Sequence, residues 1–329
     1  MKNAVLCFFF FTLVLQTPKA HLPETGDLFA ASVGERCGYI STDGTMAIGV
    51  RFENCWHFAE GLAGVIIHGK LGFIDKTGAL VIAPQFDWNV AYFSEGLAPV
   101  SLTDAAGNKR RGYVDRQGKL KLLSSITHAG NFSNGLAVVE RKAVNGYINR
   151  KMEFEIEPVF TFASSFADGL ALVRRNGEYY YINTRGQQVI NRNGSSFSEG
   201  LAFFEVESRY GLMDTTGNVL APPQFDDVEA FSNGLAGVRI NNKWGYADRT
   251  GTIVIAPEFE KAGDFSSDGI APVMKNGKYG FIDRTGQAIL GFAFDSAEWL
   301  SGGLGYVEQG AARGYINKSG MFVWRSSRQ

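Results

Sequence analysis

The chain has 329 residues, of which 45% are hydrophobic and 20% charged, with a formal net charge of -1. It is apolar enough to fold, and it is too long for one ordinary small domain unless repetition lets it grow in one dimension. A charge this close to neutral gives no indication of nucleic acid or a membrane surface as a partner.

The first twenty residues have the layout of a secretory signal peptide. Lys2 supplies a positive start, residues 4–15 form an apolar run too short to span a bilayer, and Ala20 ends the segment with a small residue. The alternative is a buried N-terminal strand. We expect residues 1–20 to be removed on export, which leaves a periplasmic or secreted chain without an integral membrane segment. Removal takes away two of 32 basic residues and none of 33 acidic ones, so the mature net charge is −3.

Two cysteines remain in the mature chain, Cys37 and Cys55, about half a repeat apart. In an oxidising compartment they could form a disulfide, and the alternative is two unpaired buried thiols. Their spacing lacks the CxxC form of a metal site.

A seven-residue motif recurs nine times, mostly at intervals of 34 residues. Typical copies are "GFIDKTG" at Gly72 and "GYADRTG" at Gly245. Asp or Asn opens a type I turn in eight of the copies, as Asp75 does, and Gly closes the turn in all of these except the one that ends at Met152. Because an amide cannot replace a catalytic acid, the interchange of Asp and Asn predicts a structural acceptor of backbone N–H groups. A period held to the end of the chain predicts a repeat architecture.

A second motif, "FSEGLAPV" at Phe93, marks the same period and recurs in six similar copies. Its Gly permits a tight turn, its Phe would anchor that turn to the core, and its apolar end would begin a strand. Each unit then reads as three strands, "LAxVxx", "GFID" and "xxVIxPxF". The third strand should end or lie at an edge, because it carries a proline. The prolines are Pro84, Pro158, Pro223 and Pro257.

These elements predict an all-β array of about nine three-stranded antiparallel meanders over residues 21–329. Three short strands cannot bury enough apolar surface alone, so stability should come from the interfaces between repeats. We favour an open curved solenoid or superhelix, because three strands are fewer than a usual propeller blade. A propeller-like ring is the alternative.

Catalytic signatures are missing from the sequence. His21, His57, His68 and His128 have no metal-binding spacing, and there is no GxSxG or HExxH motif. The sequence therefore predicts a protein without enzymatic activity, cofactor or metal.

Residues at which the sequence departs from the repeat are the candidates for partner binding, because loops on a rigid array carry function. The insertion "TDAAGNKRRG" lengthens one hairpin, and Trp88 and Tyr92 lie in a connection between repeats. Basic and aromatic side chains on a surface are typical of protein contacts. The alternative is a solvated loop and a core-facing aromatic stripe. The candidates are Lys109, Arg110, Arg111, Arg174, Arg175, Tyr179, Trp88 and Tyr92.

The copy "NNKWGYADRTGTIVIAPEF", with Lys243, Trp244 and Gly245, resembles the WG-repeat (KWG) family of bacterial proteins. The resemblance covers nearly all of the mature chain. It implies an all-β repeat protein, commonly exported, with no shared catalytic site. Trp244 is the only tryptophan at its position, so that side chain cannot be essential to each unit.

The first functional hypothesis is an exported, non-enzymatic protein-binding scaffold. On the resemblance to exported WG-repeat proteins, its role would be that of a periplasmic immunity protein. Its partner would be a secreted antibacterial toxin, such as a type VI-secreted lipase effector. The alternative is a module that binds envelope carbohydrate or peptidoglycan, which needs an aromatic exposed in phase in most repeats. A hydrolase is the third hypothesis.

Overall fold

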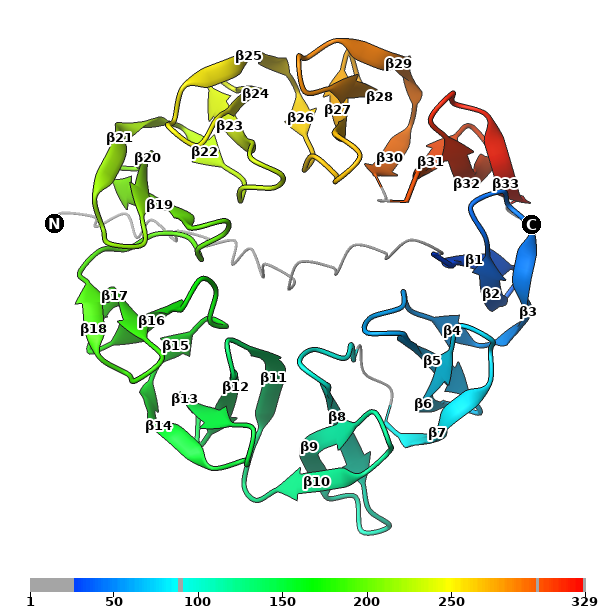
Figure 1. Ribbon diagram of the computed structural model, residues 1–329, viewed down its shortest axis with the longest axis vertical. Helices are drawn as coiled ribbons and strands as arrows, with labels where there is room; N and C mark the ends of the chain where they lie inside the picture. Colours follow the sequence, from blue (N-terminus) through cyan, green and yellow to red (C-terminus); the bar gives the residue numbers. More distant parts are fainter. Residues whose placement is uncertain (1–26, 88–90, 300–301, 328–329) are drawn as a thin grey trace, which may run out of the picture.

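The computed structural model describes residues 27–87, 91–299 and 302–327. Within them, thirty-three strands form nine small antiparallel sheets. Figure 1 shows the nine sheets arranged in a closed ring, which is a nine-bladed β-propeller. The described residues contain no helix long and apolar enough to cross a membrane. The predicted signal peptide, residues 1–20, lies outside them.

The strands are numbered in chain order, and the blades are numbered from 1 to 9. Blades 1 to 3 contain β1 (Phe29–Val33), β2 (Arg36–Ile40), β3 (Met46–Phe52), β4 (Asn54–Cys55), β5 (Leu62–Ile67), β6 (Lys70–Asp75), β7 (Leu80–Phe86), β8 (Leu97–Thr103), β9 (Lys109–Asp115) and β10 (Leu120–Leu123). Blades 4 to 6 contain β11 (His128–Ser133), β12 (Leu136–Arg141), β13 (Val144–Asn149), β14 (Phe154–Phe160), β15 (Phe162–Ala163), β16 (Leu170–Arg175), β17 (Glu178–Asn183), β18 (Gln188–Ile190), β19 (Leu201–Val206), β20 (Arg209–Asp214) and β21 (Val219–Phe225). Blades 7 to 9 contain β22 (Asp227–Val228), β23 (Ala236–Ile240), β24 (Lys243–Ala247), β25 (Ile253–Phe259), β26 (Lys261–Ala262), β27 (Ile270–Lys275), β28 (Lys278–Asp283), β29 (Ala288–Phe294), β30 (Ser296–Trp299), β31 (Leu304–Gln309), β32 (Ala312–Asn317) and β33 (Phe322–Ser327).

Within the described residues, blades 1, 3 and 6 have the predicted three strands, whereas the other six blades have four. The added strand precedes the predicted three and lies nearest the ring axis (Figure 1). In blade 2 it is only β4, which pairs Asn54 with Ile66 and Cys55 with Val65. Two residues are too short to show an alternating pattern, so the sequence did not reveal this strand.

The prediction that the proline-bearing strand lies at an edge is confirmed. The third predicted strand of each unit is an edge strand of its sheet, and these strands form the outer rim of the ring (Figure 1). The register shifts opposite the motif glycine, for example between Leu71 and Phe73 of β6. A Cβ on Gly72 would lie 2.8 Å from the carbonyl oxygen of Ile82 and 2.9 Å from the nitrogen of Pro84. The motif therefore needs glycine because the bulged rim strand approaches its backbone closely.

Pairs of aromatic rings join six of the blades to the blade that follows. Tyr147 of blade 4 and Phe166, from the "FADG" turn of blade 5, have ring centroids 4.7 Å apart. Both rings are buried, as the predicted anchoring role of the Phe requires. With this pair included, the contact occurs six times: Tyr39–Phe58, Phe73–Phe93, Tyr113–Phe132, Tyr147–Phe166, Tyr181–Phe197 and Tyr246–Phe265.

The ring closes where blade 9 meets blade 1, and this corrects the expected open solenoid. Phe29, Ala31 and Ile40 of blade 1 share a hydrophobic cluster with Leu304 and Tyr315 of blade 9. An open array leaves an apolar face at each end, which needs a polar capping repeat. Here the two end faces cover each other, and each blade is built from one continuous segment of chain.

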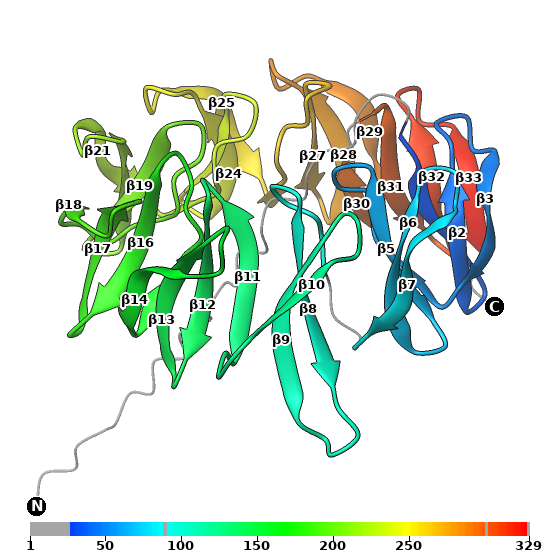
Figure 2. The ribbon, with the colours of Figure 1, turned by 60° about the horizontal axis from the view of Figure 1, so that its bottom comes forward.

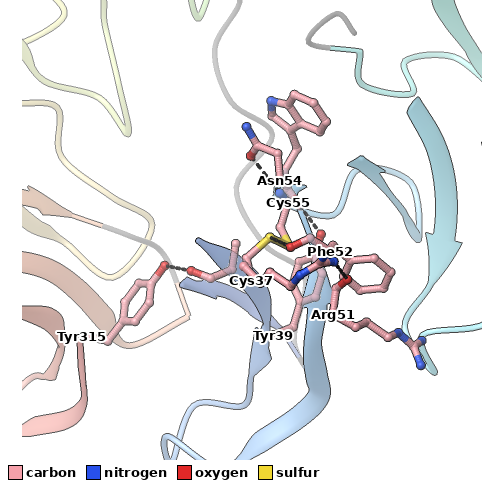
Figure 3. Close-up of a disulfide and its surroundings, with 10 residues drawn as sticks. Cys37, Tyr39, Arg51, Phe52, Asn54, Cys55 and Tyr315 are labelled. Carbon is pink, nitrogen blue, oxygen red and sulfur yellow. Dashed lines mark hydrogen bonds between the residues drawn. A yellow bond between two sulfur atoms is a disulfide. The ribbon is translucent and has the colours of Figure 1, made fainter. Parts of the chain in front are cut away.

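A disulfide joins the first two blades. Cys37 of β2 and Cys55 of β4 are bonded, with their Cα atoms 6.1 Å apart (Figure 3). Of the two states left open by the sequence, the structure has the paired one. The bond links blade 1, which carries the ring closure, to the inner strand of blade 2.

Candidate functional site

The propeller has two faces that differ in the loops they carry. Because the strands of a blade alternate in direction, the "SEG"-type and "DRTG"-type turns share one face, here called the turn face. The hairpins that join "LAxV" strands to "GFID" strands lie on the opposite side, here called the hairpin face. Figure 2 shows the long β8–β9 hairpin extending beyond its neighbours on that side.

The "DRTG" turns on the turn face are structural, as predicted. Asp75 Oδ1 accepts hydrogen bonds from the backbone N–H groups of Thr77 at 2.9 Å and Ala79 at 3.1 Å. It also accepts one from the Thr77 hydroxyl at 2.6 Å. These hydrogen bonds, the hydroxyl's first, lower the pKa of Asp75. The carboxylate is therefore held ionised as an acceptor, which is the opposite of what a general acid needs.

The acids of the "SEG" turns link neighbouring blades. Glu60 accepts a hydrogen bond of 2.9 Å from the backbone N–H of Gly96, in the next such turn along the chain. Asp168 accepts one of 2.8 Å from Gly200 in the same way. Their carboxylates are thus committed to holding the turn face together.

The hairpin face of blades 3, 4 and 5 carries most of the predicted candidates. Lys109, Arg110, Arg174 and Arg175 are exposed, and Arg111 is half-buried. Lys142, in the hairpin of the blade between them, is exposed as well, although no departure from the repeat marks it in the sequence. We call these six residues the hairpin patch. Three consecutive blades therefore present cations on one face.

Blade 5 adds aromatic rings beside its cations. Arg174 and Tyr179 are direct partners across β16 and β17. The Arg174 guanidinium lies 5.3 Å from the centre of the Tyr179 ring. Phe162 of β15 meets Tyr179 edge-on at 6.0 Å and is 37% exposed. An arginine held on an aromatic ring that remains accessible is a common anchor in protein interfaces.

Tyr92, another of the predicted aromatics, does not join this surface. Tyr92 is half-buried and stacks on His57 of the neighbouring blade, with ring centroids 4.1 Å apart. Both residues directly precede the Phe of a turn-face motif, so Tyr92 lies near the opposite face. This matches the core-facing alternative for that residue. Trp88 lies outside the described residues.

Two pockets open on the hairpin patch. One of about 160 Å³ lies between blades 3 and 4, and one of about 430 Å³ lies beside Lys142 of blade 4. Among residues 27–87, 91–299 and 302–327, no three His, Cys, Asp or Glu side chains are grouped so that they could hold a metal ion. Surface charge and an exposed aromatic ring thus characterise the candidate site.

A nine-bladed propeller built from tandem repeats is the class of protein that these observations define. The family model described as "WG containing repeat" matches residues 38–70, 72–104, 112–142, 146–179, 210–244, 244–279 and 279–311. The chain belongs to this family. The stretch 180–209, which the family model does not match, contains Tyr180 in place of the motif glycine and also the short rim strand β18.

Comparison with solved structures supports the fold alone. A structure described as a crystal structure of the eukaryotic initiation factor matches with a TM-score of 0.64 and 10% identity, over 92% of this chain and 96% of that one. Hsv2 of Kluyvelomyces marxianus matches with a TM-score of 0.43, 8% identity and coverages of 71% and 96%. Apo AztD from Citrobacter koseri matches with a TM-score of 0.32, 14% identity and coverages of 80% and 84%. The last two scores are too low to support an argument. No curated protein matches the sequence.

Proposed function

We propose that this chain is an exported, non-enzymatic protein-binding scaffold whose hairpin face holds the partner. The hairpin patch is the observation that carries the proposal. It places cations from three consecutive blades on one face, and its Arg174 forms a preorganised cation–aromatic unit with the neighbouring Tyr179. A partner that matches this face would be acidic at its contact surface.

We propose further that the partner is a secreted antibacterial toxin, such as a type VI-secreted lipase effector, and that binding neutralises it in the periplasm. This role follows from the resemblance to exported WG-repeat proteins. The disulfide between Cys37 and Cys55 supports export, because such bonds persist in oxidising compartments.

The carbohydrate-binding alternative loses the feature on which it depended. It requires an aromatic exposed in phase in most repeats, and the "GF/GY" ring was the candidate. In the structure that ring is at most 7% exposed in every blade that has one. The rings are Tyr39, Phe73, Tyr113, Tyr147, Tyr181, Tyr246, Phe281 and Tyr315.

A competition experiment tests the proposal. Cells that lack the gene should be killed by sibling cells that deliver the toxin encoded beside it, and the intact gene should restore survival. Substitution of Arg110, Arg174 and Arg175 by Glu should abolish both rescue and capture of the toxin by the purified chain. The matched control, Arg150→Glu, changes a cation of the turn face and should rescue fully. If the deletion strain resists every neighbouring toxin, the immunity role is wrong.

A further inference from the structure

The pocket between blades 3 and 4 lies at a position that aromatic or apolar side chains occupy in most other blades, the exceptions being Asn145 in blade 4 and Arg313 in blade 9. Register identifies this position as the residue directly before the motif glycine, which is Trp244 in blade 7 and Arg111 in blade 3. Trp244 packs against the same hydrophobic cluster as Ala262 of the next blade. Tyr210 with Val228, and Tyr279 with Ala297, repeat this arrangement. In blade 1 the position is Cys37, which is bonded to Cys55, the residue of blade 2 that corresponds to Ala262 of blade 8.

Between blades 3 and 4 the two facing residues are Arg111 and Ala129. Both line the pocket, together with Lys109 and His128. The methyl group of Ala129 and the half-buried guanidinium of Arg111 leave a gap between their blades, whereas Ala262 and the indole of Trp244 pack against one cluster. The substitution of arginine for an aromatic ring thus accompanies an open slot of about 160 Å³ lined by cations.

A buried hydroxyl also belongs to this slot. Ser101 lines it and is only 3% exposed, and its Oγ has no hydrogen-bond partner among the described residues. Buried hydroxyls are nearly always hydrogen-bonded, so an unpaired one beside an open pocket indicates a missing acceptor or donor. The residue stands directly opposite Arg111 across β8 and β9.

The charges of the slot are not balanced by ion pairs. Among the ion pairs of the described residues, none involves Lys109, Arg111 or His128. Two acids lie beside the slot, and both have other partners. Glu140 is opposite His128, and its carboxylate accepts a hydrogen bond from the Thr127 hydroxyl. Asp87, whose backbone N–H donates to the carbonyl oxygen of Ser101, forms an ion pair with Lys70. Three cationic or polar donors and a free hydroxyl therefore converge on one small opening.

We infer that this slot receives a carboxylate side chain of the protein partner, bound by Arg111 and Lys109 and hydrogen-bonded by the Ser101 hydroxyl. Arg is suited to this role because its planar guanidinium can bind a carboxylate with two parallel hydrogen bonds. The inference rests on the proposed function, because it takes the ligand to be part of a protein.

Calorimetric titration of the purified mature chain with an acetylated hexaglutamate peptide tests the slot directly. We expect the peptide to bind and hexalysine not to bind. Arg111→Trp should lower the affinity for hexaglutamate at least about tenfold, because an indole would fill the slot as Trp244 does elsewhere. The same variant should keep its melting temperature or raise it, so that a loss of binding cannot be attributed to unfolding. Ser101→Ala should weaken binding by up to about tenfold, which corresponds to the loss of one hydrogen bond to a charged group.

Arg313→Trp is the matched control. Arg313 occupies the same motif position in blade 9, where it stands opposite Glu308. This variant should bind hexaglutamate as the unchanged chain does. The inference is overturned if hexaglutamate shows no binding even at millimolar concentration, or if Arg111→Trp binds as tightly as the unchanged chain. It is also overturned if inorganic phosphate binds more tightly than the peptide. Because these measurements use a defined peptide, they can fail while the toxin is still captured, and they can succeed where no toxin is found.

Discussion

The hydroxyl of Tyr315, in the last blade, donates a hydrogen bond of 2.6 Å to the carbonyl oxygen of Ala30, in the first blade. Tyrosines at the same motif position make the equivalent bond to the following blade five more times. These bonds are Tyr39 to Trp56, Tyr113 to Gly130, Tyr147 to Ser164, Tyr181 to Ser195 and Tyr246 to Gly263. The ring is therefore closed by the contact that also joins its internal blades. Burial raises the pKa of these tyrosines, so they remain protonated donors.

Removal of this closing hydrogen bond should destabilise the ring. Tyr315→Phe keeps the ring packing and leaves the carbonyl oxygen of Ala30 without its donor, so the free energy of unfolding should fall by about 1–2 kcal/mol. Urea unfolding followed by circular dichroism measures this difference. Tyr147→Phe, which removes the same bond between internal blades, is the comparison and should lose a similar amount. A Tyr315→Phe variant as stable as the unchanged chain would show that the bond does not help to close the ring.

The disulfide should be a substantial part of the stability of the first blades. Cys37 and Cys55 are separated by 18 residues, and cross-linking a loop of this size stabilises a fold by about 3 kcal/mol in the chain-entropy model. A Cys37→Ala, Cys55→Ala chain that begins at residue 21 should therefore unfold at lower urea concentration. Adding reductant should destabilise the unchanged chain and leave this double variant unaffected. Titration of the denatured, unreduced mature chain with a thiol reagent should detect no free thiol, and two free thiols would contradict the bond.

The aromatic contact between blades should have a much larger effect than a surface ring. Phe166 is 1% exposed and packs on Tyr147, so Phe166→Ala should cost about 3–5 kcal/mol by leaving a cavity at the interface. Phe162 is nearby in sequence and 37% exposed, and Phe162→Ala should cost less than about 1 kcal/mol. Thermal unfolding of the two variants side by side makes the comparison. Equal losses would mean that the buried pairs do not hold the blades together.

The motif glycine should not tolerate even a methyl group. A Cβ at Gly245 would lie 2.4 Å from the carbonyl oxygen of Ile255 and 2.7 Å from the nitrogen of Pro257. Because both atoms belong to the backbone, Gly245→Ala should cost about 2 kcal/mol or more through displacement of the rim strand. Gly49, in the rim strand of blade 1, has open space where its methyl group would lie, with no atom within 4 Å, so Gly49→Ala is the neutral control. The melting temperatures of the two variants measure these effects. An unchanged melting temperature for Gly245→Ala would refute the explanation by close backbone approach.

Stability should depend on the protonation of Glu229. Burial, and then the charges of Asp264 and Asp227, raise the pKa of this carboxyl from 4.5 to about 6. Between these two values the folded chain retains a proton that the unfolded chain has released, so this group's contribution falls as the pH rises through the window. Because Glu229 is partly exposed, the full effect should not exceed about 1 kcal/mol.

The variant Glu229→Gln isolates this contribution. Above pH 6 it should melt at a higher temperature than the unchanged chain, because it has no charge to bury. At pH 4 the two proteins should melt together, because the unchanged carboxyl is then protonated in the folded state. Parallel melting curves with a constant offset across this range would rule out titration of Glu229 as the cause.

Much of the candidate site could be predicted because its determinants are local. The "GNKRRG" insertion and the hairpin that pairs Arg174 with Tyr179 each lie within one pair of strands, whose register follows from short-range pattern. The stacking of Tyr92 on His57 could not be predicted, because it joins two blades. The slot beside Arg111 was missed for the same reason. Its second wall, at Ala129, belongs to the following blade.

Three strands of the repeating unit follow from the amino-acid order alone, through the turn at Asp75, the glycine at Gly72 and a proline-bearing strand left at an edge, whereas the added inner strand does not. Each depends on backbone conformations and contacts within one blade, which a motif of a few residues specifies. The closing of nine units into a ring is different, because it depends on how the small rotation between neighbouring blades accumulates. Closure brings Tyr315 to Ala30 across 285 residues. No short-range sequence pattern encodes this accumulated rotation, because it arises from the packing at all the interfaces between blades together.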